Sequence, residues 1–100
     1  MNEHSFLITY DLNTGLSETD RGKTLSKAYE DLEEQIKKYG TWAHIQQSCW
    51  AVVTVSTAAQ IRDDLMSVLH TTDNILVLQS ANIAAWHNVM CTNKWMKEHV

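Results

Sequence analysis

Asp11 is the first residue of the chain whose type and position could do chemistry. The apolar run Phe6–Tyr10 (FLITY) is typical of a buried strand, and it leads directly into this carboxylate. The simplest interpretation is a turn in which Asp11 bonds the backbone near Asn13. The alternative is a magnesium ligand, because Mg²⁺ usually binds one or two carboxylates together with water and phosphate oxygens. If two-fold symmetry brought two copies of Asp11 together, they could share one Mg²⁺ that polarises a phosphodiester.

Asp20 and Arg21 follow in the polar segment 12–22, which contains Gly15 and Gly22. The acid could support a metal ion and the guanidinium could contact a phosphate. A solvated loop that leads into the next helix is the simpler interpretation of both residues.

His87 and Cys91 are four residues apart, so on a helix they could provide two zinc ligands. Two further ligands would be needed, and none lies nearby in the sequence, so we do not expect a zinc site. Ser48 or Cys49 could act as a nucleophile only with a base and an orienting group, and the sequence places neither.

Composition limits what the chain can bind. One hundred residues with 44% apolar side chains suit one domain, and the net charge of −4 is unfavourable for tight non-specific binding of nucleic acid. The four tryptophans could stack on bases, but they are more typical of a core or an interface. The sequence predicts a cytoplasmic protein with reduced thiols and no membrane association. It has two cysteines but no C-x-x-C pair, it has no run of roughly 20 apolar residues, and its start (MNEHS) is polar.

The hydrophobic periodicity predicts the elements that position these residues. One helix face is formed at helical spacing by Leu25, Tyr29, Leu32, Ile36 and Tyr39, with Gly40 as its stop. On the opposite face, Glu33–Lys37 and Glu34–Lys38 are expected i,i+4 ion pairs. Strands are expected at 42–46, 49–55 and 75–79, with a turn or bulge at 47–48. A second helix begins at Thr57, with a capping box to Gln60.

The order of these elements predicts an α+β fold: a ferredoxin-like βαββαβ sandwich with a four-stranded antiparallel sheet. We expect a single domain over residues 1–100, with a core at 1–80 and a C-terminal tail at 81–100 that packs on the sheet or on a partner subunit. Both helices should cover one face of the sheet. Trp50 and Val52, or their neighbours, would then be exposed on the other face unless the tail or a second subunit covers them, so we expect a homodimer.

The segments ITYDL, KKYG and IQQSCW, followed by AAWHNVMCTNKWM in the tail, resemble the small ferredoxin-like CRISPR-associated (Cas) endonuclease family, and most closely its SinR-type and VapD-like relatives. The resemblance implies a homodimer and a magnesium-dependent nuclease with Asp11 as metal ligand. It also implies supporting roles for Asp20 and Arg21, and a substrate-binding role for Ser48 in the matching Gln47–Ser48 pair. The long loop 12–22 and the acidic balance depart from that family.

Two functions from different classes follow. The first is a Cas-like or VapD-like dimer that engages RNA or DNA, with Mg²⁺ as cofactor and endonuclease activity at Asp11. The second is a module without chemistry that binds a protein partner, such as a regulator or decoy of a defence or toxin system.

Overall fold

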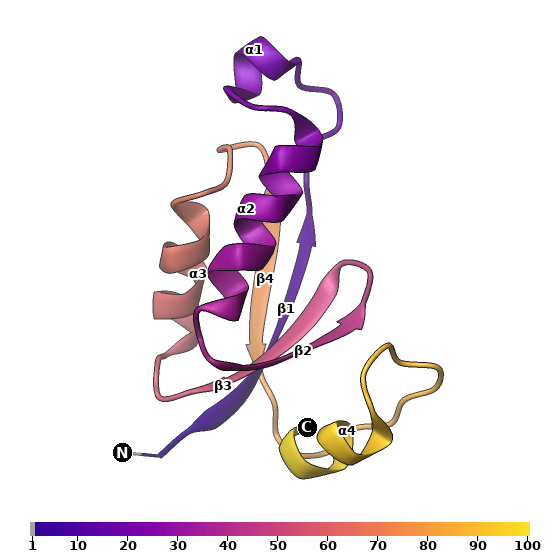
Figure 1. Ribbon diagram of the computed structural model, residues 1–100. Coiled ribbons are helices and arrows are strands. Elements are labelled where there is room, and N and C mark those ends of the chain that lie inside the picture. Colours follow the sequence, from indigo (N-terminus) through magenta and orange to yellow (C-terminus); the bar gives the residue numbers. More distant parts are fainter. Residues whose placement is uncertain (1) are drawn as a thin grey trace.

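The computed structural model describes residues 2–100 as an α+β fold built on one four-stranded antiparallel sheet (Figure 1). The sheet order is β2-β3-β1-β4, which places the first and third strands in the centre and is the predicted ferredoxin-like arrangement. The strands are β1 (His4–Asp11), β2 (Thr41–Gln46), β3 (Cys49–Thr54) and β4 (Asn74–Gln79). The helices are α1 (Glu18–Arg21), α2 (Leu25–Lys37), α3 (Ala58–Met66) and α4 (Asn93–His99). Within residues 2–100, no helix is long and apolar enough to cross a bilayer.

One face of the sheet is covered by α2 and α3, and the main core lies between these layers. Alternate residues of the central strands point into it, and the helices contribute residues at helical spacing. Burial of this face is the main source of stability. The core consists of Phe6, Ile8, Tyr10, Leu12, Ala28, Leu32, Ile36, Trp50, Val52, Ile61 and Leu65.

Of the two alternatives for β3, the structure places the neighbours of Trp50 and Val52, not these two residues, on the face away from the helices. Trp50 and Val52 pair across the sheet with Ile8 and Phe6, and all four side chains pack against the helices. Strand β3 is apolar on both faces, so alternation alone could not decide which set points toward the helices. The other face of β3 is formed by Cys49, Ala51 and Val53.

The C-terminal tail packs on the second face of the sheet, over β2 and β3, which is one of the two predicted locations. Met96 of α4 is buried against Ile45 and Ala51, and the Met90 N–H donates to the Ile45 carbonyl at 2.8 Å. Figure 1 shows the tail leaving β4 and returning toward β2. The tail leaves the β4 part of this face open, where Leu76 and Leu78 remain 51% and 52% exposed.

The helix ends follow from side-chain capping. Thr57 and Gln60 form the predicted capping box of α3, in which the backbone N–H of Gln60 donates to Thr57 Oγ1 at 3.1 Å. The segment 12–22, predicted to be a loop, contains α1, which is capped by Ser17 and ends at Gly22 with a φ of 87°. The expected Glu33–Lys37 and Glu34–Lys38 ion pairs are absent among residues 2–100.

Candidate functional site

The residues that the sequence analysis selected gather at the end of the sheet where β1 terminates. Asp11 is the last residue of β1 and pairs with Asn74, the first residue of β4. The Tyr10 N–H donates to the Ser48 carbonyl at 3.3 Å, which places the β2–β3 turn beside the same strand end. Asp20 lies on α1, beyond this end of the sheet (Figure 1).

Asp11 lies on the face of the sheet that the helices do not cover. Leu7, Thr9 and Asp11 alternate with the buried Phe6, Ile8 and Tyr10. In the register with β4, Leu7 is opposite Leu78 and Thr9 is opposite Leu76. Asp11 is therefore a carboxylate at the end of the open, partly apolar half of the sheet face.

Asp11, Asp20 and Ser48 are exposed, and within residues 2–100 no hydrogen bond or ion pair joins any two of them. The only side chain opposite Asp11 across the sheet is the neutral amide of Asn74. Mg²⁺ usually takes one or two carboxylates and completes its octahedron with water and phosphate oxygens. Among residues 2–100, Asp11 and Asp20 are therefore separate exposed carboxylates near this end of the sheet, with no bond between them.

Arg21 does not have the role that the resemblance implied. Its guanidinium makes a bidentate ion pair with Asp73, with Nη1 at 2.7 Å from Oδ2 and Nη2 at 2.8 Å from Oδ1. Nη2 also donates to the Asn13 carbonyl at 2.9 Å. The Arg21 side chain is 3% exposed and that of Asp73 is 0% exposed, so this guanidinium is not presented to a phosphate.

The Arg21–Asp73 pair fixes α1 to the start of β4. Asp73 also accepts hydrogen bonds from the backbone N–H groups of Asn13 and His70. Although burial opposes ionisation, the hydrogen bonds from Arg21, Asn13 and His70 lower the pKa of Asp73 to about 2. Because Asp73 directly precedes Asn74, this network holds the segment carrying Asp20 next to the strand end that carries Asp11.

A second polar group lies on the helix-covered side of the β2–β3 turn. Trp50 is buried, and its Nε1–H donates to the Tyr10 hydroxyl at 3.0 Å. Burial raises the pKa of that hydroxyl. The His44 ring stacks on Trp50 with centroids 4.1 Å apart, and His44 Nε2 is 3.1 Å from the Gln47 carbonyl. These contacts fix the turn that presents Ser48.

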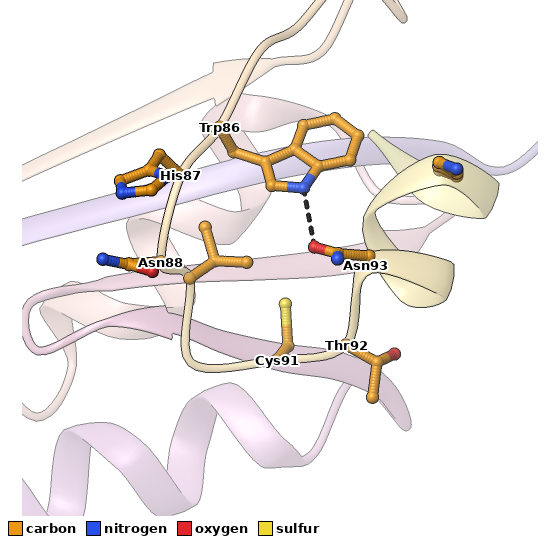
Figure 2. Close-up of a pocket in the computed structure, with 8 residues that line it drawn as sticks. Trp86, His87, Asn88, Cys91, Thr92 and Asn93 are labelled. Atoms are coloured by element: carbon orange, nitrogen blue, oxygen red, sulfur yellow. Dashed lines mark hydrogen bonds between the residues drawn. The ribbon is translucent and has the colours of Figure 1, made fainter.

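The tail forms an open polar hollow of about 620 Å³ (Figure 2), and none of its lining residues was a predicted site residue. The Trp86 Nε1–H donates to Asn93 Oδ1 at 3.1 Å and closes this loop on itself. Figure 2 shows the Cys91 side chain pointing into the loop and His87 pointing away from it. The part of the chain from 2 to 100 contains no group of three or more metal-ligating His, Cys, Asp or Glu side chains.

Neither the protein-family models nor the curated proteins that were searched give a match to this chain.

Sequence reasoning missed the residues that hold Arg21. Asp73 was not among the predicted site residues, and its partner lies 52 positions earlier in the chain. A buried ion pair between two loops has no periodic signal in the sequence. The one local indication is that Asp73 lies at the end of a strand. It directly precedes the apolar strand 74–79, just as Asp11 directly follows the apolar run 6–10.

Proposed function

We propose that this chain acts as a homodimer of the Cas-like or VapD-like class, engages nucleic acid, and hydrolyses phosphodiesters with Mg²⁺ held by Asp11 from both copies. The observation that carries the proposal is the position of Asp11. It is an exposed carboxylate at the end of the sheet face on which Leu76 and Leu78 are left half-exposed by the tail.

The proposed dimer packs the open parts of two sheet faces together. Burial of Leu76 and Leu78 would drive the association, because burying apolar surface is favourable by roughly 25 cal/mol per Å². A two-fold axis near the end of β1 would place the two Asp11 carboxylates side by side. When bound there, Mg²⁺ would relieve their mutual repulsion and polarise the scissile phosphate. The exposed Ser48 hydroxyl would donate to a phosphate oxygen, and Asp20 would supply a further acid.

Replacement of Asp11 tests the proposal. We expect the wild type to cleave RNA or DNA only in the presence of Mg²⁺, and Asp11→Asn to reduce the rate by about two orders of magnitude or more. The matched control is Asp63→Asn, which removes an exposed carboxylate on α3. Light scattering of each variant would show that the oligomeric state is unchanged. Cleavage by Asp11→Asn at the wild-type rate would exclude the catalytic role.

A second function, a protein-binding module without chemistry, is favoured by a different observation. Arg21 is committed to Asp73, and within residues 2–100 no other acid is bonded to Asp11 at the end of β1. The same half-exposed leucines would then contact a different protein. Recovery of one defined partner by the wild type but not by Leu78→Glu, with no Mg²⁺-dependent cleavage, would favour this function over the first.

A further inference from the structure

Most basic side chains of this acidic protein are already paired with acids. Five of its eight Lys and Arg side chains lie within 4.0 Å of a carboxylate oxygen. Arg21 pairs with Asp73, Lys23 and Lys27 share Asp31, Arg62 contacts Asp63, and Lys94 contacts Glu98. The three that remain available to an external anion are Lys37, Lys38 and Lys97.

Lys37 and Lys38 are consecutive residues at the end of α2, and Lys37 lies beside an exposed tryptophan. Trp42 is 37% exposed on β2, which is an edge strand of the sheet. The Lys37 Nζ lies 5.2 Å from the Trp42 ring centroid and 5.8 Å from that of Trp50. Lys38 Nζ donates only to the neutral amide oxygen of Gln35, at 3.0 Å.

The surroundings hold Trp42 in place. Its ring is tilted against buried Trp50, with centroids 5.3 Å apart, and Trp50 is fixed by its hydrogen bond to Tyr10. The His44 ring stacks on the same indole. The nearest acids along α2, Glu33 and Glu34, lie one turn before the two lysines and pair with neither of them. At the edge of the sheet, an ordered indole thus lies beside Lys37, which is followed in the chain by Lys38, and neither lysine is paired with an acid among residues 2–100.

We infer that Lys37, Lys38 and Trp42 form a binding site for single-stranded nucleic acid, in which a base stacks on Trp42 and the lysines contact flanking phosphates. This inference rests on the proposed nucleic-acid function and names the form of the substrate. Stacking on an aromatic side chain requires a base free of its own duplex, and the unpaired lysines beside it would attract the flanking phosphates. The site lies on the helix-covered side at β2, and Asp11 lies on the opposite face at the end of β1.

The test is fluorescence anisotropy with labelled oligo(dT) and oligo(U), titrated at low and at physiological salt. We expect Trp42→Ala to weaken binding about 10-fold, because stacking on one aromatic side chain contributes about that much per base. Trp42→Phe should retain most of the affinity. Lys37→Gln with Lys38→Gln should reduce the slope of log K against log salt by about 1.4, since each phosphate contact on a single strand contributes about 0.7.

Two matched controls accompany these variants. Met66→Ala truncates another exposed apolar side chain, and Lys94→Gln removes a lysine that is paired with an acid. Neither should change the affinity or the salt slope by as much as the site variants. The lysine variants alter only exposed positions, so they test the site even if Trp42→Ala reduces folding.

Failure of this inference and failure of the proposed nuclease give different results. Equal affinity of wild type and Trp42→Ala, or no binding of either oligonucleotide, would overturn the inference whether or not Asp11-dependent cleavage is present. Binding that depends on Trp42 and the lysines, without cleavage in Mg²⁺, would support the inference and remove the nuclease.

Discussion

Asp73 shows how a single side chain can decide the structure of a loop. It has no exposed surface and accepts four hydrogen bonds, two from Arg21 and one each from the Asn13 and His70 amides. A buried carboxylate is tolerated only when its charge is matched and its lone pairs are satisfied. The Arg21 guanidinium, for which the resemblance implied a phosphate contact, is thus bound within the protein to Asp73 and the Asn13 carbonyl.

The first prediction at this scale concerns acid stability. The pKa of Asp73 is about 2 in the folded protein and near 3.9 in an unfolded chain. Its ionisation therefore contributes to the free energy of unfolding, and this contribution is fully present above about pH 4. That contribution, of roughly 2 kcal/mol, should be lost as the pH falls from about 4 to 2. Urea unfolding at a series of pH values measures it. Asp73→Asn should cost about 3–5 kcal/mol at neutral pH, because it leaves the Arg21 charge buried without a partner.

The control for this prediction is Asp63→Asn, which alters a carboxylate that is 65% exposed. It should change the unfolding free energy by less than about 0.5 kcal/mol. An Asp73→Asn protein with the stability and the acid profile of the wild type would show that the pair does not hold the loop.

At the scale of elements, the sequence predicts what depends on periodicity and local capping. The stripe from Leu25 to Tyr39 predicts α2, and Thr57 with Gln60 marks the start of α3 because these signals lie within a few residues of each other. The sequence could not show which side chains of β3 point toward the helices, because both faces of this strand are apolar. The Arg21–Asp73 pair could not be predicted either, because it joins distant segments, and for the same reason the sequence left open whether the tail packs on the sheet or on a partner subunit. For the site, the position of Asp11 at a strand end was predicted, and its surroundings were not.

The tail is an element whose attachment can be measured through a thiol beneath it. Cys49 packs against the same group as Met96 and Trp86, and burial raises the pKa of its thiol. In a Cys91→Ser background, Met96→Ala should speed labelling of Cys49 by about tenfold or more, because truncating a buried Met weakens docking by about 2 kcal/mol or more. The rate of reaction with a thiol reagent in native conditions measures this.

Lys94→Ala on the same helix is the matched control, since that side chain is 84% exposed. It should leave the labelling rate unchanged. If Met96→Ala also left the rate unchanged, opening of the tail would not control access to Cys49.

At the scale of the whole molecule, the protein is a thin two-layer body. Helices α2 and α3 cover one face of its sheet, and the tail covers only part of the other face. The smallest extent of the molecule is 19 Å, as expected for one sheet and one layer of helices. The tail protects β2 and β3. Leu76 and Leu78 on β4, together with the 90% exposed Ile83 at the start of the tail, remain in solvent. Leu76 and Leu78 lie on the same face of β4, and neighbouring exposed apolar groups of this kind mark surfaces that bind other molecules.

The final prediction tests whether this surface joins two copies of the chain. Leu78→Glu places a charge opposite Leu7 on the open face, so it should convert a dimer into a monomer, with a dissociation constant raised at least about 100-fold. Sedimentation or light scattering across a concentration series measures this change. Met66→Glu is the matched control, because Met66 is equally exposed but lies on α3, on the helix side of the sheet. A monomeric wild type, or a dimer that tolerates Leu78→Glu and dissociates with Met66→Glu, would show that two copies of Asp11 do not meet across this face.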